Sequence, residues 1–486
     1  MRVTVIVILV FGFIGLKAQT TANLKAELNN LLQDVDLKNA SISFVAVDLT
    51  TKQVVAELNP IQSVVPASVT KLITTATALE LLGANFQFNT SIYYNGFIDT
   101  INHVLHGNII IKGGGDPSLG SNRYEKHYGS FMSDWANAIK SLGIDSINGK
   151  VIGDASYFNE QMIPSTWIWG DVGNYYGAGP SGLSIYENTC TIDFVSGSNS
   201  GDSTYILCVK PFIPDLEIEN LVKSKNTNKD ESYFFGGPYQ NNKMVKGGIP
   251  LNQKDFSVKS SLPDPAFLAS YELTMELTKN GVGVAQQNST ARMEKNTENI
   301  KLATLITELK SPRLIDLIKL TNFYSINLYA EHFMNQIGVT KYGSGDTESS
   351  TQATQEFWKQ KGIDVSGMYL NDGSGLSRFN SYSAKHLADV LTYMKTSKNF
   401  EQFYSSLPVL GKSGTVRSLG VNSAAEGNIR AKSGYMTRVR SYAGYCTTKS
   451  NKELAFTIMV NNYNCSPTEM KKKMEKVMIK LAEINE

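Results

Sequence analysis

The chain has 486 residues, which is long enough for a large core and for two or more domains. Hydrophobic residues make up 42% of the sequence and charged residues 19%, the balance of an ordinary globular protein. The formal net charge is only +2, which argues against nucleic acid or an acidic membrane surface as the main partner.

Residues 1–18 have the layout of a secretory signal peptide. A positive charge at Arg2 precedes an apolar run from Val3 to Leu16, and the small residue Ala18 marks the expected cleavage site. An uncleaved membrane anchor is the alternative, but the run is short for a membrane span. We therefore expect a mature protein that is exported to the periplasm, soluble and without a stable membrane anchor.

Export permits disulfide bonds, but the sequence does not choose among the possible pairings of Cys190, Cys208, Cys446 and Cys465. Cys190 with Cys208 is conceivable within one hairpin. No two cysteines form a Cys-x-x-Cys pair, and the five histidines are scattered along the chain. We expect neither a metal site nor a cofactor.

The two ends of the chain predict parts of one sheet with helices on it. Residues 24–35 have helical periodicity, and "ISFVAVDLTTKQVVAELN" (42–59) predicts a β-hairpin. Three runs between residues 428 and 462 predict successive antiparallel strands, and the last 20 or so residues predict a helix with one apolar face. The fold class is therefore α/β, or more narrowly α+β.

The middle of the chain has a different composition. From about Phe86 to Pro263 it is rich in Gly, Asn, Ser and Tyr and has short β-like runs, and helical periodicity returns only after Pro263. We expect one or two β-rich domains at residues 89–262, inserted into a domain whose two parts are residues 19–88 and 263–486.

A candidate nucleophile lies in "VVPASVTKLITTATALELLG" (64–83), where a helix is predicted to begin. Ser68 and Lys71 are three residues apart, so they lie on the same side of the first turn. A serine hydroxyl is a poor nucleophile until a base removes its proton, and a lysine is such a base when burial and a second cation lower its pKa. Alone, Ser-x-x-Lys is weak, because it also occurs by chance.

Two further motifs strengthen this interpretation. Ser325-Ile326-Asn327 falls where one predicted helix passes into the next, so a hydroxyl and an amide side chain can enter a cleft there. Ser325 as a mere helix cap is the alternative. Lys-Ser-Gly occurs twice, at Lys412–Gly414 and at Lys432–Gly434. The second copy follows a β-compatible run, whereas a helix end and a loop flank the first.

Ser-x-x-Lys, Ser-x-Asn and Lys-Ser/Thr-Gly, in this order, are the motif set of penicillin-binding proteins and β-lactamases. The separation between Ser68 and Ser325 is far longer than in β-lactamases. The chain therefore resembles the class C low-molecular-mass penicillin-binding proteins, the D-Ala-D-Ala carboxypeptidase/endopeptidases. "IKGGGDPSL", "YYGAGPSGLSIYEN" and "NDGSGLSRFN" agree, and the likeness covers essentially the whole mature chain. It implies a β-lactamase/transpeptidase-like domain, an antiparallel sheet flanked by helices, split by the β-rich insert.

The resemblance also implies which Lys-Ser-Gly works. In this fold an edge strand beside the nucleophile forms one wall of the cleft, so the working copy should lie on a strand. "IRAKSG", which contains Lys432, Ser433 and Gly434, is similar to the Lys-Thr-Gly strand of the family. "LPVLGKSGTVRS", which contains Lys412, is similar to a segment whose lysine is not catalytic.

By the same resemblance, Ser68 is the nucleophile, Lys71 the general base, and Ser325 the relay that carries the proton towards the leaving amine. Asn327 holds an amide of the substrate. The backbone N–H groups of Ser68 and Tyr435 form the oxyanion hole.

Four more side chains bind the substrate in this interpretation. Lys432 and Ser433 bind the terminal carboxylate, and Lys432 also disfavours a protonated Lys71. Asp154 and Arg378 grip the free end of a diaminopimelate side chain in relatives. The alternatives are a turn-capping role for Asp154 and a loop-tying role for Arg378.

The sequence thus predicts a serine DD-peptidase. It cleaves the D-Ala-D-Ala bond of peptidoglycan stem peptides, or peptide crosslinks, through an acyl-serine, and β-lactams are its covalent inhibitors. The alternatives are a β-lactamase, which the long inserts disfavour, and a catalytically silent peptidoglycan-binding protein, which has no chemical reason to keep all the motifs. The balance between carboxypeptidase and endopeptidase activity is left open.

Overall fold

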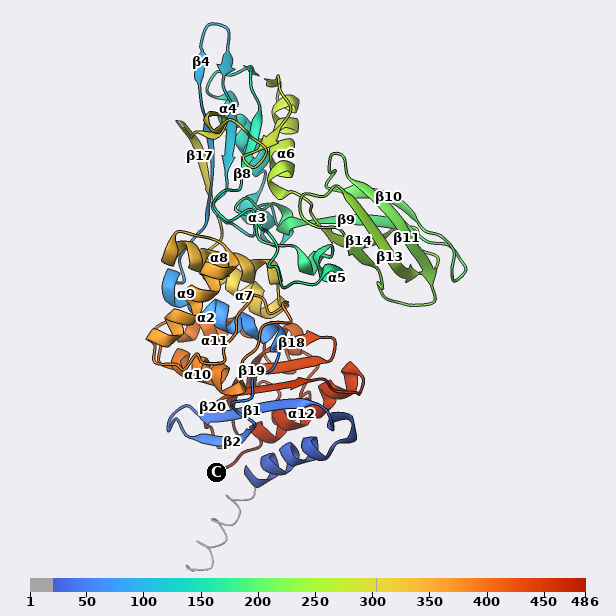
Figure 1. Ribbon diagram of the computed structural model, residues 1–486, viewed down its shortest axis with the longest axis vertical. Helices are drawn as coiled ribbons and strands as arrows, with labels where there is room; N and C mark the ends of the chain where they lie inside the picture. Colours follow the sequence, from blue (N-terminus) through green and yellow to red (C-terminus); the bar gives the residue numbers. More distant parts are fainter. Residues whose placement is uncertain (1–20, 303) are drawn as a thin grey trace, which may run out of the picture. The chain divides into compact units, whose positions relative to one another are not determined.

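The computed structural model describes residues 21–302 and 304–486 (Figure 1). The predicted signal peptide lies outside these residues. Over the described residues, no helix has the length and apolar character that a membrane span requires. The chain forms two compact units. The first comprises the residues up to Asn85, Leu314–Ile326 and Thr351–Glu486, and the second comprises Phe86–Arg313 and Asn327–Ser350.

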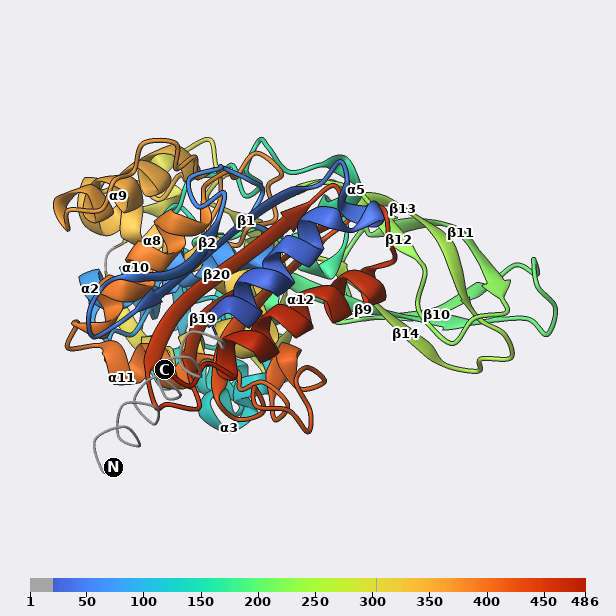
Figure 2. The same ribbon diagram turned by 90° about the horizontal axis from the view of Figure 1, so that it is seen from below.

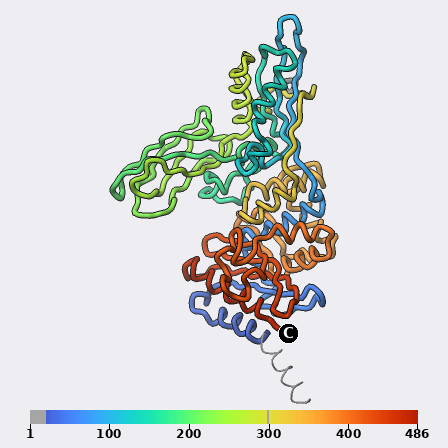
Figure 3. The backbone as a smooth tube through the Cα atoms, turned by 180° about the vertical axis from the view of Figure 1, so that it is seen from behind, coloured from blue at the N-terminus to red at the C-terminus, as the bar shows by residue number. Residues whose placement is uncertain are grey.

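The first unit is built on a five-stranded antiparallel sheet of order β18-β19-β20-β1-β2. Its strands are β1 (Ser41–Asp48), β2 (Val54–Leu58), β18 (Ile429–Met436), β19 (Val439–Thr447) and β20 (Glu453–Asn461). The expected hairpin and the three expected C-terminal strands are all present. Strands from opposite ends of the chain lie side by side, as the blue and red segments in Figure 3 show. β18 is an edge strand of this sheet, and the start of its outer side hydrogen-bonds to residues 408–410, through the Leu410 N–H to the Ile429 carbonyl and the Ala431 N–H to the Pro408 carbonyl.

Helices cover both faces of this sheet. On one face lie the helix of residues 21–33 and α12 (Pro467–Ala482), which Figure 2 shows next to each other. α12 begins with a capping box between Ser466 and Glu469, and its buried face packs with the first helix into one apolar core. On the other face, α10 (Ala384–Lys395) packs on β1, β19 and β20.

The remaining helices of the first unit lie near α2 (Thr70–Leu82), which is buried along most of its length. They are α7 (Leu314–Tyr324), α11 (Phe400–Ser406) and most of α9 (Thr347–Gln360).

The second unit contains a five-stranded sheet of order β16-β8-β6-β3-β17 and a four-stranded sheet of order β15-β7-β5-β4. The first has β3 (Asn89–Tyr94), β6 (Ile109–Lys112), β8 (Val151–Asp154), β16 (Ser289–Thr290) and β17 (Thr304–Lys310). The second has β4 (Phe97–Asp99), β5 (Val104–His106), β7 (Ser146–Ile147) and β15 (Gly283–Val284). Its helices are α3 (Glu125–Tyr128), α4 (Phe131–Lys140), α5 (Trp169–Val172), α6 (Pro265–Lys279) and α8 (Asn327–Tyr342).

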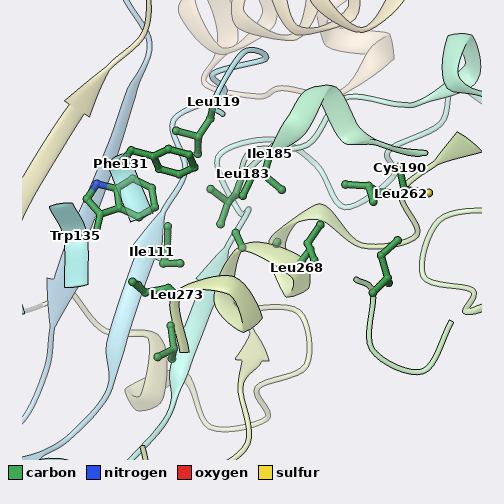
Figure 4. Packing of buried hydrophobic residues seen from close by; sticks show 14 of the residues in the cluster. Ile111, Leu119, Phe131, Trp135, Leu183, Ile185, Cys190, Leu262, Leu268 and Leu273 are labelled. Atoms are coloured by element: carbon green, nitrogen blue, oxygen red, sulfur yellow. The ribbon is translucent and has the colours of Figure 1, made fainter. Parts of the chain in front are cut away.

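Two three-stranded sheets complete the second unit. One has the order β10-β9-β14, with β9 (Thr189–Val195), β10 (Tyr205–Lys210) and β14 (Phe256–Ser261), and the other has the order β11-β13-β12, with β11 (Glu217–Lys225), β12 (Tyr233–Phe235) and β13 (Asn242–Pro250). A continuous apolar cluster joins the sheets and helices of this unit. Ile111 of β6, Trp135 of α4, and Leu268 and Leu273 of α6 all belong to this cluster (Figure 4).

The second unit extends further along the chain than the expected insert of residues 89–262. β17 pairs with β3, with Thr307 opposite Ile92, and α6 packs on β8. Residues 263–313 are therefore held by the insert rather than by the first unit. α8 also belongs to the second unit.

The conceivable pairing of Cys190 with Cys208 is wrong, because all four cysteines are free thiols. Cys208 lies opposite Asp193 in the β9–β10 ladder, while Cys190 lies opposite Ser260 in the β9–β14 ladder. One hairpin holds both residues, but its register keeps them from meeting. Across the described parts of the chain, no three His, Cys, Asp or Glu side chains gather in a way that would hold a metal ion.

Candidate active site

Ser68 lies in the short helical turn Ala67–Val69 that leads directly into α2. Ala67, just before it, has a φ of +53°, a conformation that residues other than glycine seldom adopt. Because an observed backbone outlier often marks a functional turn, this strain points to Ser68. Ser68 is half-buried, so its hydroxyl is reachable.

Lys71 is fully buried and lies one turn after Ser68. Its Nζ donates a hydrogen bond to Ser68 Oγ at 3.1 Å and another to the backbone carbonyl of Ser374 at 2.6 Å. The expected side-by-side placement of Ser68 and Lys71 is therefore present. The Ser374 carbonyl was not predicted, because a main-chain oxygen leaves no signal in residue type.

The second Lys-Ser-Gly lies on edge strand β18, as expected. Lys432 is fully buried, and its Nζ donates to Ser325 Oγ at 2.8 Å and to the Ser433 carbonyl at 2.7 Å. Burial, together with the positive charge of Lys71, lowers the pKa of Lys432 well below its usual range. The charge of Lys71 thus disfavours a charge on Lys432, and each lysine reaches one serine hydroxyl.

Gly434 brings β18 against the nucleophile. A Cβ built on Gly434 would lie 2.9 Å from the backbone nitrogen of Ser68 and 2.1 Å from Ser441 Oγ. Only glycine allows this approach. Tyr435 follows directly, and its ring is half-exposed beneath the guanidinium of Arg440, at 4.7 Å. Its backbone amide comes one residue after Gly434 on β18.

Ser433 Oγ donates a hydrogen bond to Thr415 Oγ1 at 2.7 Å. Thr415 is exposed and directly follows the first Lys-Ser-Gly copy. The sequence interpretation did not give Thr415 a role. The signal that was available is its place in "GKSGTV", which is similar to the Gly-Thr segment of the family.

The first Lys-Ser-Gly lies in a loop between α11 and β18. Gly414 begins a single helical turn, Gly414–Val416, and Lys412 is largely exposed. Within this copy, Lys412 pairs with Glu426 and Ser413 Oγ accepts the backbone N–H of Val409.

Ser325 and Asn327 end up in different units. Ser325 ends the stretch that carries α7 in the first unit, where it meets Lys432, and its φ is +62°. Asn327 is the first residue of α8 in the second unit, where its Nδ2 donates to the Tyr176 carbonyl at 2.7 Å.

Asp154 and Arg378 also lie in different units. Asp154 ends β8, is 3% exposed, and pairs with Lys112 Nζ at 2.8 Å. It also accepts a hydrogen bond from the backbone N–H of Ser156, so it caps a turn. Arg378 is exposed on the loop between α9 and α10 of the first unit.

These features define a serine acyl-transfer site that uses lysine rather than histidine as base. A serine just before a helix is hydrogen-bonded to a buried lysine, and a second buried lysine is hydrogen-bonded to a second serine. A strand with a glycine at the point of closest approach lies beside the first serine.

Comparison with known proteins gives the family. The chain belongs to the D-Ala-D-Ala carboxypeptidase 3 (S13) family, whose model matches residues 24–483. It is therefore a serine DD-peptidase, a hydrolase of the low-molecular-mass class C penicillin-binding type.

Curated relatives agree along most of their length. The chain is 26% identical over 473 residues to the D-alanyl-D-alanine carboxypeptidase of Actinomadura sp. (strain R39), covering 95% of this chain and 84% of that protein. It is 25% identical over 448 residues to D-alanyl-D-alanine carboxypeptidase DacB of Haemophilus influenzae, covering 90% of this chain and 88% of that protein.

The solved structure of penicillin binding protein 4 (dacB) from Haemophilus influenzae matches the fold. The TM-score is 0.79 at 25% identity, over 93% of this chain and 98% of that chain. The expected β-lactamase/transpeptidase-like fold is therefore confirmed.

Proposed function

We propose that this DD-peptidase cleaves the D-Ala-D-Ala bond of stem peptides, and the equivalent bond of peptide crosslinks, through an acyl-enzyme on Ser68. The observation that carries the proposal is the contact between Lys71 Nζ and Ser68 Oγ inside a buried site. A lysine kept out of water beside a hydroxyl is suited to accept its proton.

In the acylation step, Ser68 Oγ attacks the carbonyl carbon of the penultimate D-Ala while Lys71 takes the hydroxyl proton. The carbonyl oxygen becomes an oxyanion between the backbone N–H groups of Ser68 and Tyr435. Each such donor is worth roughly 10²–10³ in kcat. The close approach of Gly434 to Ser68 supports this pairing of amides.

Collapse of the intermediate then breaks the peptide bond. Ser325, bonded to Lys432, gives its hydroxyl proton to the departing amine and takes back the proton that Lys71 removed from Ser68, so both Lys71 and Ser325 return to their starting states. Proton transfer of this kind contributes roughly 10²–10⁴-fold. Water attacks the resulting ester and frees Ser68. When the departing amine belongs to another stem peptide instead of a terminal D-Ala, the same steps open a crosslink.

Substrate binding follows from the polar groups around β18. Ser433 and Lys432 bind the carboxylate of the leaving residue, together with Thr415, whose hydroxyl accepts the hydrogen bond of Ser433 Oγ. Asn327 holds an amide of the substrate. One solved structure of penicillin binding protein 4 from Haemophilus influenzae is a complex with a β-lactam, which supports β-lactams as covalent inhibitors here.

Arg378 and Asp154 are proposed to bind the free end of the side chain of the third stem residue. The exposure of Arg378 supports a ligand-binding role. If Arg378 has this role, Arg378→Ala should hydrolyse a stem peptide with a free diaminopimelyl end more slowly than the wild type does. Its rate on the same peptide with that end amidated should stay the same. An unchanged ratio between the two peptides would refute the role.

The site of action proposed for the protein is the periplasm, after removal of residues 1–18. Mass spectrometry of the protein from a periplasmic extract should find a new N-terminus near Gln19. An intact Met1 would contradict export by cleavage.

The central test is labelling of the purified mature protein with fluorescent penicillin, beside Ser68→Ala. A stable covalent band that is lost in Ser68→Ala would support the acyl-serine mechanism. Ser63→Ala is a matched control, because Ser63 lies five residues before Ser68 in the sequence and its hydroxyl donates to the Gly367 carbonyl. Rapid release of the label would instead indicate β-lactamase activity. Absence of a band from the folded wild type would refute the proposal.

A further inference from the structure

The backbone carbonyl that accepts a hydrogen bond from Lys71 belongs to a loop, and the side chain that holds this loop in shape has no role in the mechanism described above. This loop, residues 371–380, has the sequence "NDGSGLSRFN". Its Ser374 carbonyl accepts the hydrogen bond from Lys71 Nζ at 2.6 Å, and its Gly373 carbonyl accepts one from Thr74 Oγ1 at 2.7 Å. Two successive carbonyls of the loop thus point at the helix that carries the base.

The loop also packs closely against the turn that carries Ser68. A Cβ built on Gly375 would lie 2.0 Å from the carbonyl oxygen of Ala67, the residue before Ser68. Gly375 has a φ of +81°, so glycine is required both for the backbone conformation and for the close approach. A shift of this loop would therefore change the positions of both Ser68 and Lys71.

One side chain holds the loop in shape. Asp372 is fully buried, and its carboxylate accepts hydrogen bonds from the backbone N–H of Gly375 at 2.8 Å and of Ser377 at 2.5 Å. It also accepts one from Asn380 Nδ2 at 2.6 Å, and Asn380 in turn accepts one from the N–H of Asn371. The Asp372 carboxylate therefore closes the loop from both sides of Ser374.

We propose that Asp372 is a positioning residue for catalysis: it fixes the Ser374 carbonyl, and this carbonyl fixes the direction of Lys71 Nζ towards Ser68. The inference rests on the proposed role of Lys71 as base. A flexible lysine side chain has three rotatable donors and no preferred direction of its own. An acceptor held by a rigid loop removes that freedom, so the base is aligned before substrate binds.

The test is Asp372→Asn, a change of nearly the same shape that places an N–H₂ group where a backbone N–H must be accepted. Acylation by fluorescent penicillin is followed by stopped flow, which separates the acylation rate constant from the affinity of the first, non-covalent complex. We expect the rate constant to fall by about 10²-fold, as for a misplacement of about 1 Å, while the affinity changes little.

Asp364→Asn is the matched control. Asp364 also accepts a backbone N–H, that of Ser366 at 2.9 Å, but it is exposed and its turn does not contact Lys71. We expect Asp364→Asn to acylate as the wild type does. A merely structural role for Asp372 would lower the melting temperature and the fraction of active protein, but not the rate constant of the folded molecules.

A milder variant covers the case in which Asp372→Asn does not fold. Asn380→Ala removes the side-chain amide that donates to Asp372 and should slow acylation in the same direction by a smaller factor. A folded Asp372→Asn or Asn380→Ala with the wild-type rate constant would overturn the inference, as would a loss in affinity alone. If the wild type itself is not labelled, the proposed function fails instead.

Discussion

The two copies of Lys-Ser-Gly have the same three residues and opposite surroundings. Lys432 is fully buried on β18 and bonded to Ser325, whereas Lys412 is 58% exposed in a loop and pairs with Glu426 at 2.5 Å. Ser433 is bonded to Thr415 beside the nucleophile. Ser413 instead accepts the backbone N–H of Val409 and only closes its own turn.

The difference shows that this tripeptide is not a site by itself. On a strand, successive side chains point to opposite faces, so Lys432 enters the interior while Ser433 faces the other way. In a turn, the same residues satisfy local backbone groups and solvent. The loop copy nevertheless contributes to the site, because the residue after it, Thr415, meets Ser433.

The lysines should give the largest contrast. Lys432→Ala should lower the acylation rate by about 10²–10⁴-fold, the range for loss of a positioned proton-transfer group, because Ser325 loses its partner. Lys412→Ala should label with fluorescent penicillin as the wild type does. Loss of labelling in Lys412→Ala, with retention in Lys432→Ala, would reverse the assignment of the two copies.

The glycines should separate activity from stability. In Gly434→Ala the new methyl group would meet the Ser68 amide and Ser441, so acylation should be lost even in folded protein. In Gly414→Ala, a φ of +57° and contact with Pro408 should lower stability by about 1–3 kcal/mol. Thermal unfolding and labelling on the same samples test this, and an active Gly434→Ala would contradict it.

Lys432→Met should make the protein more stable but inactive. Because burial and Lys71 lower the pKa of Lys432 below the value of about 10.5 for a free lysine, the unfolded chain binds more protons than the folded one between those two pKa values. The wild type therefore gains stability as the pH rises through this window. Lys432→Met should be more stable at pH 7, by about 1–4 kcal/mol as for other buried charges replaced by apolar groups.

The check is the difference in melting temperature between Lys432→Met and wild type from pH 7 to pH 10. It should shrink as the pH rises. Lys412→Met serves as the control and should show no such difference, because its side chain is mostly in water. A difference in melting temperature that widens as the pH rises would mean that burial does not disfavour the charged form of Lys432.

The serines should give the smallest contrast. Ser433→Ala loses the hydroxyl that meets Thr415 and should slow acylation by about 2–10-fold, the worth of one hydrogen bond. Ser433→Thr keeps the hydroxyl and should stay near the wild-type rate. Ser413→Ala should affect only melting temperature. A larger rate loss in Ser413→Ala than in Ser433→Ala would contradict the assignment.

Much of the site was predictable because its motifs are short-range. The spacing of Ser68 and Lys71 places them on one turn, and the β-compatible residues before Lys432 indicate a strand. The compact second unit continues to Arg313, beyond the predicted end of the insert at residue 262. The apolar periodicity of residues 265–279 correctly predicts helix α6, but it does not tell which sheet the helix covers. In the structure, α6 packs on β8 of the second unit.

The sequence by itself determined the residue types of the site, the hairpin and strands of the first unit, and the family. Only the tertiary structure decided that Thr415 and the Ser374 carbonyl join the site, that Cys190 and Cys208 stay apart, and that Asp372 closes the loop behind Lys71. The reason is physical. Motif spacing follows from the fixed geometry of one helix or one strand, whereas these contacts depend on register and packing between segments distant in the chain, which no local pattern encodes.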